Sequence, residues 1–320
     1  MEFMYFLKLS LTSILAFILT WFFTKIFISN VSNKLISKPN HRSSHKDPIP
    51  QGGGLIFLLI ASASSLILGN SSLVIGCIPI GIIGFLDDFY KINPLARYIA
   101  QLFTVIYLIN NQGIPNYGML QNSVFFAYFL SVLLIIFFTA IINFVNFMDG
   151  IDGLVAINFI IFLFVSSINI SLSFLPLMMM MMGFIIWNWN PAKVFMGDTG
   201  STFLGSITVL IFLENESLIN AFFLILVITP LLFDAFSCVI RRLIAGQNIF
   251  RPHKLHLYQR LHQAGWSHGK VSLIYGIASC ILSILFLLSK YKLLIFTALL
   301  AIFVGIFLDK RFAKPFNLKV

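Results

Sequence analysis

Apolar runs long enough to cross a lipid bilayer follow one another along almost the whole of this 320-residue chain. Hydrophobic residues make up 59% of the sequence and charged residues only 10%. A water-soluble domain of this size needs far more polar surface, so the composition predicts an all-α, polytopic membrane protein. We expect about eleven spans, over residues 4–28, 54–69, 73–89, 95–110, 124–145, 153–168, 174–189, 201–213, 219–240, 270–289 and 293–308.

Neither a cleaved leader nor a cysteine framework is expected. The run over residues 3–27 is too long for the apolar core of a signal peptide and lacks a small-residue cleavage site, so we interpret it as a retained first span. Cys77, Cys238 and Cys280 are far apart in apolar runs, which indicates neither disulfides nor a metal cage.

The basic side chains predict the orientation in the membrane. The net charge of +10 is compatible with nucleic-acid binding, but its distribution is that of a membrane protein and we expect no nucleic acid. One face would have only Lys290 and Lys292 beyond its short polar loops. The other would carry Lys34, Lys38, Arg42, Lys46, Lys91, Arg97, Lys193, Arg241, Arg242, Arg251, Lys254, Arg260, Lys270, Lys310, Arg311, Lys314 and Lys319. The positive-inside rule makes that second face cytoplasmic, with the N-terminus outside and the C-terminus inside.

Acidic side chains gather where the apolar runs end. A carboxylate at the bilayer centre costs roughly 2.5–3.5 kcal/mol on insertion scales, so such residues usually mark a working site. They are Asp87, Asp88, Asp149, Asp152, Asp198 and Asp234. We expect one integral membrane domain over residues 1–320, whose active-site loops lie on the cytoplasmic face near 38–54, 87–97, 143–153, 190–201 and 241–268.

Each acidic element also has a purely structural interpretation. The Asp87-Asp88 pair could be offset by Lys91 one helical turn later. Asp198 could cap a helix, and Asp234 could pair with a neighbouring arginine such as Arg241. Packing alone explains the segment 143–153 least well, because it has two asparagines, two aspartates and two glycines within eleven residues.

Taken together, these residue types favour phosphoryl transfer. Carboxylates that converge repel one another unless a cation lies between them, and oxygen ligands without thiolate favour Mg²⁺, with Mn²⁺ as the alternative. Positive charge for anionic oxygens would come from Arg241, Arg242, Arg251, Lys254 and His256. A metal ion plus fixed cations is what the transfer of a phosphoryl group requires.

Four motifs in order resemble a known family. They are Asp87-Asp88, the pattern Asn-x-x-Asn-x-x-Asp-Gly-Ile-Asp-Gly-Leu over 143–154, Phe-Met-Gly-Asp-Thr-Gly-Ser over 195–201, and a basic loop with histidines. This order resembles the polyprenyl-phosphate N-acetylhexosamine-1-phosphate transferases of bacterial inner membranes, of the glycosyltransferase family 4 type. The resemblance implies transfer of a sugar 1-phosphate from a UDP-N-acetylhexosamine to undecaprenyl phosphate, with release of UMP and the start of O-antigen or another cell-surface polysaccharide.

The same resemblance implies a role for each matching residue. Asp198 and Asp152 would hold Mg²⁺, and Asp87, Asp88 and His256 would be catalytic, with Asp87 accepting a proton from the lipid phosphate or orienting it. Substrate-binding residues would be Lys46, Asn143, Asn146, Asp149, Phe195, Arg251, His253 and Lys254. Within this set, Phe195 would stack on uracil. The resemblance leaves open a homodimer.

Alternatives remain at the level of the subgroup and of the class. Peptidoglycan-precursor enzymes carry three consecutive histidines in the last cytoplasmic loop, whereas this chain has Pro-His-Lys-Leu-His-Leu-Tyr-Gln over 252–259, which resembles the O-antigen branch. A phospho-muramyl-pentapeptide transferase is therefore the nearer alternative. A multi-span transporter is the more distant one, since its intramembrane charges normally lie near mid-span in related half-repeats.

Overall fold

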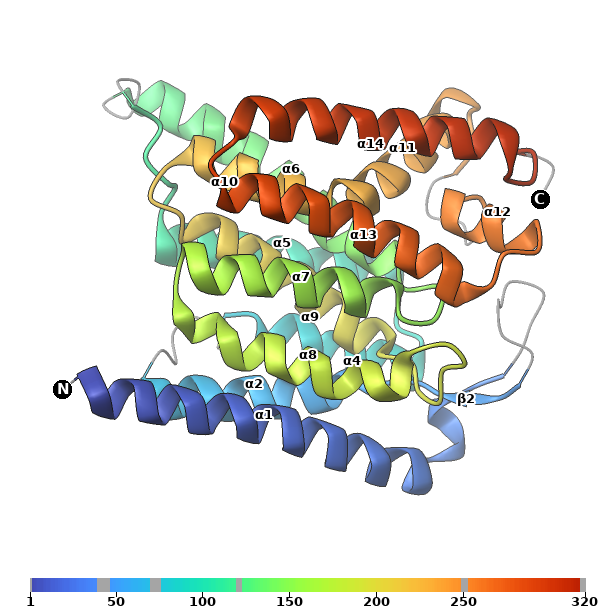
Figure 1. The fold of residues 1–320 in the computed structure, drawn as a ribbon, viewed down its shortest axis with the longest axis horizontal. Helices are drawn as coiled ribbons and strands as arrows, with labels where there is room; N and C mark the ends of the chain where they lie inside the picture. The colour runs from blue at the N-terminus through green and yellow to red at the C-terminus, as the bar shows by residue number, and fades with distance from the viewer. Residues whose placement is uncertain (1, 39–46, 70–75, 119–122, 249–252, 317–320) are drawn as a thin grey trace.

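The chain forms a bundle of long helices whose axes run broadly along one direction (Figure 1). The computed structural model describes residues 2–38, 47–69, 76–118, 123–248 and 253–316. The helices are α1 (Glu2–Asn30), α2 (Gly54–Leu68), α4 (Ile78–Tyr90), α5 (Pro94–Gln112), α6 (Val124–Phe147), α7 (Leu154–Asn169), α8 (Leu175–Asn188), α9 (Gly197–Leu213), α10 (Leu218–Ile225), α11 (Thr229–Ile244), α12 (Leu257–Gln263), α13 (His268–Leu287) and α14 (Tyr291–Arg311), with short 3₁₀ turns η1 (Asn33–Leu35), η3 (Leu172–Phe174) and η4 (Leu226–Ile228).

The predicted helical class is confirmed, with one small addition. In the described part of the chain, β1 (Ile36–Ser37) pairs antiparallel with β2 (Ile49–Pro50), in the register Ile36 to Pro50. This ribbon lies at the end of the bundle where α1 ends and α2 begins (Figure 1). It closes the loop predicted to face the cytoplasm.

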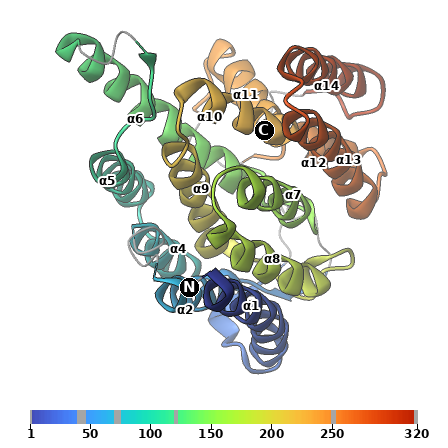
Figure 2. The ribbon, with the colours of Figure 1, turned by 60° about the vertical axis from the view of Figure 1, so that its left-hand side comes forward.

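Helix α9 is the centre of the bundle. Every residue from Thr199 to Leu213 is buried, and the helix packs against α2, α4, α5 and α6 (Figure 2). A helix that is buried all round has no face for water or lipid, which explains why its sequence shows no amphipathic stripe. Asp198, in the first turn of α9, therefore has a fixed position relative to the surrounding helices.

Glycines bring the backbones of α2, α4 and α9 into direct contact. A Cβ added to Gly84 would lie 2.5 Å from the carbonyl oxygen of Asp198, and one added to Gly54 would lie 2.1 Å from the amide nitrogen of Gly200. Close helix approach through small residues is typical of packing in membranes. Here it sets the end of α4, with its two aspartates, directly beside the first turn of α9.

Large apolar side chains remain exposed on the outside of the bundle, as expected for a lipid-facing surface. In α14 only Leu294 and Ala298 are buried. Among the described residues, five helical stretches are long and apolar enough to cross a membrane, and four shorter apolar helices accompany them. The protein is thus a multi-pass membrane protein. Each of the eleven predicted spans overlaps a helix, although eleven crossings remain a prediction.

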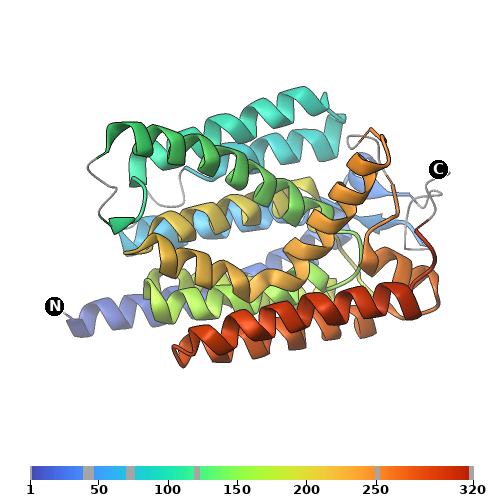
Figure 3. The same ribbon diagram turned by 90° about the horizontal axis from the view of Figure 1, so that it is seen from above.

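The predicted span 219–240 is broken in the structure. Helix α10 ends at Ile225, the turn η4 follows, and α11 begins at Thr229 with Pro230 in its first turn. Proline has no N–H to donate and clashes with the preceding turn, so it suits a helix start and breaks a continuous helix. The orange segment in Figure 3 bends there, so that α11 runs at an angle to α10.

All the predicted active-site loops that the structure describes lie at one end of the bundle. The ends of α4 and α6, the start of α9, the β-ribbon and the short helix α12 are found there, on the right in Figure 1. Helix α1 starts at the opposite end, and α14 finishes at the same end as these loops.

Candidate active site

Asp88 caps the N-terminus of the central helix from a different helix. Its Oδ1 accepts the amide of Asp198 at 3.0 Å, and its Oδ2 accepts the amide and the hydroxyl of Thr199 at 3.1 and 2.6 Å. A carboxylate at this place satisfies otherwise unpaired amides and complements the helix dipole. Gly197 is required beside it, because an added Cβ would lie 2.4 Å from Oδ2. Asp88 therefore fixes the backbone that carries Asp198.

Arg97 joins the two remaining carboxylates of this region. Its Nη1 lies 2.6 Å from Asp87 Oδ2 and 2.8 Å from Asp198 Oδ2. About a third of the side chains of Arg97 and Asp198 is exposed, at 32% and 30%, whereas Asp87 is 11% exposed. The bridge is therefore open to a ligand at the Asp198 side. From the sequence, Arg97 was used only as one of the basic residues that set the orientation in the membrane. Its position six residues after Lys91, close to the Asp87-Asp88 pair, was the available sign that it pairs with an aspartate.

Helix α6 presents its asparagines to the same place. Asn146 donates from Nδ2 to Asp198 Oδ1 and to the hydroxyl of Ser201, both at 2.8 Å. One turn earlier, Asn143 exchanges amide hydrogen bonds with Gln101 at 2.6 and 3.2 Å. Residues three apart share a helix face, so the Asn-x-x-Asn spacing directs both amides at α5 and α9. We use the term carboxylate cluster for Asp87, Asp88, Arg97, Asn146 and Asp198.

Asp149 follows the end of α6 and lies within the negative field of this cluster. Its side chain is partly buried. The pKa of its carboxyl is raised well above the usual range, first by burial and then by the negative charges of Asp198, Asp88 and Asp152. A nearby cation would stabilise the ionised form of such a carboxyl strongly, because burial and like charges both disfavour it.

Asp152 faces away from Asp198 and ties its loop to α13. Its Oδ1 is 3.0 Å from His268 Nδ1, its Oδ2 accepts the amide of Ala192 at 3.1 Å, and its carbonyl accepts the hydroxyl of Ser272 at 2.7 Å. The aspartate is 5% exposed. It therefore holds the glycine-rich segment 149–153 in place.

Phe195 lies next to the first glycine-rich loop. Its amide donates to the carbonyl of Pro50 at 2.8 Å, and its carbonyl accepts the amide of Gly53 at 3.0 Å. The side chain is partly exposed and belongs to the loop that precedes Asp198. Two of the predicted substrate-binding residues, Lys46 and Arg251, lie outside the described residues.

A second aspartate, Asp234, caps helix α12 in the way that Asp88 caps α9. Its Oδ1 accepts the amide of Leu257 at 2.7 Å, and its Oδ2 accepts the amide of Tyr258 at 3.0 Å and the hydroxyl of Tyr275 at 2.8 Å. The structural alternative of an ion pair with Arg241 is not what the structure has, because Arg241 pairs with Asp309 at 2.5 Å.

The predicted histidines lie just before α12. His256 is 3% exposed, His253 is half-buried, and their ring centroids are 4.9 Å apart. Burial lowers the pKa of both rings to about 3, with further lowering of His253 by His256 and of His256 by Arg242 and Arg260. Both imidazoles are therefore neutral at physiological pH. Burial also lowers the pKa of Lys254.

Tyr258 connects the two groups of residues. Its hydroxyl donates to the carbonyl of Phe147 at 2.9 Å, at the end of α6. Gly150 is needed there, since an added Cβ would lie 2.0 Å from that hydroxyl oxygen. The loop 148–153 thus stands between α12 and the carboxylate cluster, so the sequence motifs meet around one loop.

Comparisons with known proteins agree with this arrangement. Residues 70–215 match glycosyl transferase family 4. A probable undecaprenyl-phosphate N-acetylglucosaminyl 1-phosphate transferase of Bacillus subtilis (strain 168) is 28% identical over 314 residues, covering 88% of this chain and 87% of the relative. Phospho-N-acetylmuramoyl-pentapeptide-transferases of Kosmotoga olearia and Clostridium beijerinckii are 26% and 29% identical, covering 76% and 75% of this chain and 84% and 82% of their own lengths.

The fold and these matches define a multi-pass membrane transferase. These matches agree with the predicted family: residues 70–215, which contain both the Asp87-Asp88 pair and Asp198, match glycosyl transferase family 4. The match spans α4 to α9, the helices that build the carboxylate cluster.

Proposed function

We propose that this protein transfers an N-acetylhexosamine 1-phosphate from a UDP-sugar to undecaprenyl phosphate and releases UMP. The observation that carries the proposal is the Arg97 bridge between Asp87 and Asp198, a charged and partly exposed group at the end of an apolar bundle. Such a site suits an acceptor whose chain lies in the membrane and whose phosphate lies at its surface. The names of the relatives supply the chemical class of both substrates.

The carboxylate side fits a magnesium ion. Its donors are oxygens of Asp198 and Asp149, and hard cations such as Mg²⁺ prefer oxygen. The raised pKa of Asp149, caused by burial and by like charges, also indicates a place where a cation is favourable. The sequence predicts Asp198 and Asp152 as its ligands. Because Asp152 lies 3.0 Å from His268 Nδ1 and accepts the amide of Ala192, we propose Asp149 in its place beside Asp198, with Asp152 positioning their loop. When bound, the ion neutralises charge on the donor diphosphate.

The residues of the chain have distinct tasks in the transfer. A phosphate oxygen of the lipid forms a bond to the β-phosphorus of the UDP-sugar, while the bond from that phosphorus to the bridging oxygen breaks and UMP leaves. Asp87 orients the lipid phosphate or accepts its proton, and Arg97 holds Asp87 beside Asp198. The neutral ring of His256 donates a hydrogen bond to diphosphate oxygens, and Phe195 stacks on uracil.

The test measures UMP release from purified protein with undecaprenyl phosphate and Mg²⁺. A UDP-N-acetylhexosamine should be used, a UDP-muramyl-pentapeptide should not, and EDTA should stop the reaction until Mg²⁺ or Mn²⁺ is restored. Efficient use of the pentapeptide donor would favour the peptidoglycan-precursor alternative. No release with any UDP-N-acetylhexosamine, or full activity in EDTA, would contradict the proposal.

A cavity of about 740 Å³ between α11, α13 and α14 offers room for part of the prenyl chain. Its lining includes Phe233, Ile274, Ala278, Ala301 and Gly305, with charged side chains at one end. This volume lies within the roughly 300–1,000 Å³ that is usual for small-molecule sites. Asp234 and Leu257, which help line the cavity, belong to the contact that positions α12, so the cavity borders the site.

The cavity assignment predicts a selective effect on the acceptor. Ala301→Trp fills the cavity and should raise the KM for undecaprenyl phosphate by about tenfold, in line with the loss of 1–3 kcal/mol of apolar contacts. The KM for the UDP-sugar should not change. Leu299→Trp is the matched control, because Leu299 is 60% exposed on the same helix and does not line the cavity. Equal effects of the two variants would contradict the assignment.

We further propose that the site faces the cytoplasm of a bacterial inner membrane, with the N-terminus outside. In a variant without the native cysteines, Lys193→Cys should react with an impermeant thiol reagent only after the inner membrane is opened. Asn111→Cys, exposed at the other end of the bundle, should react in intact cells. The reverse pattern would invert the topology.

A further inference from the structure

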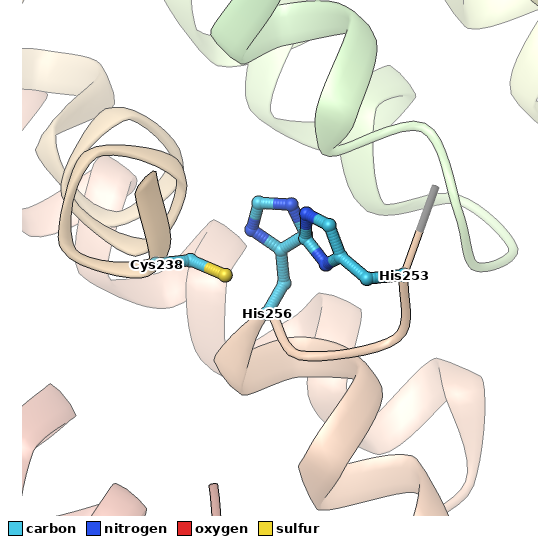
Figure 4. Close-up of side chains that lie close together, drawn as sticks. All are labelled: Cys238, His253 and His256. Carbon is cyan, nitrogen blue, oxygen red and sulfur yellow. The ribbon is translucent and has the colours of Figure 1, made fainter. Parts of the chain in front are cut away.

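Three soft or borderline ligand groups lie close together near α12 (Figure 4). They are the thiol of Cys238 on α11 and the imidazoles of His253 and His256 in the following loop. One ligand atom of each lies within 4.8 Å of the ligand atoms of the other two. We name these three residues the histidine cluster.

Burial separates this cluster from ordinary surface histidines. Cys238 is 2% exposed and His256 is 3% exposed. Within the described residues, Nδ1 of His256 has no hydrogen-bond partner. The nearest carboxylate oxygen, Oδ1 of Asp234, is 3.8 Å away and already accepts the amide of Leu257. A buried nitrogen without a partner, on a ring that lies close to two other ligand groups, indicates a missing ligand.

The donor set selects the kind of ligand. Thiolate and imidazole bind Zn²⁺ and other late transition metals, whereas Mg²⁺ takes oxygen. Both histidine rings are neutral in the folded protein and offer a lone pair without losing a proton, whereas the thiol of Cys238 gives up its proton to the solvent as the metal–sulfur bond forms. Three protein ligands leave a fourth tetrahedral position open, as in zinc sites that accept water or an anion.

The geometry requires only a small adjustment. In a tetrahedral site with the usual zinc–sulfur and zinc–nitrogen distances, ligand atoms are roughly 3.3–3.8 Å apart, so the three groups must move together by about 1 Å. His253 is half-buried on a loop and can supply most of this shift. Its Nδ1 now accepts the amide of Leu255 at 3.2 Å, which leaves Nε2 for a ligand. When Nε2 binds the metal, the ring proton moves to Nδ1. Nδ1 then no longer accepts the amide of Leu255, and the metal–nitrogen bond takes the place of that hydrogen bond.

We propose that Cys238, His253 and His256 form a binding site for a transition-metal ion, Zn²⁺ in the first place, distinct from the oxygen site at Asp198. A consequence, which rests on the proposed function, is that the occupied site inhibits transfer. Zinc withdraws His256 from the diphosphate and holds the loop before α12 in one position.

Binding is tested without reference to activity. The purified full chain is titrated with Co²⁺ as a spectroscopic substitute for Zn²⁺, and thiolate-to-cobalt charge-transfer absorption is recorded. Wild-type protein should bind one Co²⁺ with this absorption and release it to Zn²⁺. Cys238→Ser and His253→Ala should each weaken binding by at least about tenfold, as expected for loss of a ligand. Cys280→Ser is the matched control, because Cys280 is the exposed free cysteine of α13 and should change nothing.

Activity then tests the consequence. Micromolar Zn²⁺ with Mg²⁺ in excess should inhibit wild-type protein and Cys280→Ser, whereas Cys238→Ser should keep its basal activity and resist zinc. No thiolate absorption in wild-type protein, or equal binding by Cys238→Ser, would overturn the site. Specific binding without inhibition would overturn only the inhibitory role, and absent transfer with intact cobalt binding would count against the proposed function alone.

Discussion

The carboxylate cluster and the histidine cluster lie at the same end of the bundle, yet they are built differently. In the first, Arg97 bridges two carboxylates and part of the site is exposed. In the second, two of the three donors are almost fully buried, and the nearest carboxylate, Asp234, already accepts two amides and a tyrosine hydroxyl. The difference separates the proposed site for charged substrates and a hard cation from the proposed site that selects by the softness of its donors.

The largest effect should come from the exposed carboxylate. Asp198→Asn keeps the size of the side chain but removes the charge that a hard cation needs, so UMP release should fall by about two to three orders of magnitude. Glu216→Gln, an exposed acid at the other end of the bundle, is the control and should be neutral. A folded Asp198→Asn variant with more than about a tenth of wild-type activity would remove Asp198 from the metal site.

A second, smaller loss should follow removal of the bridge. Arg97→Gln leaves the carboxylates of Asp87 and Asp198 without compensation, and activity should fall by about tenfold to a hundredfold, since charge-assisted hydrogen bonds contribute about 1.5–3 kcal/mol. A double-mutant cycle with Asp87→Asn measures the coupling through kcat/KM. Additive losses would mean that Arg97 and Asp87 act independently, against the geometry.

The two capping aspartates allow a direct comparison of stability. Asp88→Asn and Asp234→Asn each retain one acceptor oxygen of the original two, so each should lower the free energy of unfolding by about 1–3 kcal/mol. Thermal unfolding in detergent measures this. Only Asp88→Asn should also reduce the affinity for Mg²⁺, because only Asp88 fixes the backbone of Asp198. An equal change in metal affinity for both variants would contradict this distinction.

The smallest effect concerns acid sensitivity and belongs to the histidine cluster. The pKa of His253 and His256 is about 3 in the folded protein and 6.5 for an ordinary histidine. Between these values the unfolded chain binds protons that the folded chain does not, so stability is lost as pH falls through this window. In chelator, the melting temperature of His253→Gln should fall less on acidification than that of wild-type protein. Identical pH profiles would show that His253 does not contribute.

Much of the fold follows from the sequence because each apolar run must become a helix in lipid. The break at 226–228 was missed, since Pro230 is compatible with a helix start or with a kink and only packing decides. The four sequence motifs do meet around the loop 148–153. The motifs could not predict which way each side chain points. Asp152 points to His268, and both carboxylate oxygens of Asp88 accept hydrogen bonds from the start of α9.

Residues outside the motifs were the harder part. Arg97 was visible as a charge, but its partners are ten and 101 positions away. The expectation that Cys238 takes no part in a metal cage came from its distance to the other cysteines. The side chains that approach it are histidines of a loop fifteen or more residues later, and the turn of the chain between α11 and α12 cannot be derived from spacing.

The glycine contacts between α2, α4 and α9 have a consequence for mutational tolerance. Gly54, Gly84 and Gly200 have no side chain, yet each has backbone or packed side-chain atoms where a Cβ would stand. In a library of all single substitutions scored by polysaccharide production, these positions should tolerate as little as Asp198. Gly69 and Gly246 have open space around them, so a substitution there meets only the strain of a positive φ and no steric clash. Intolerance in such a library would therefore trace the backbone frame of the active site as sharply as its charged side chains.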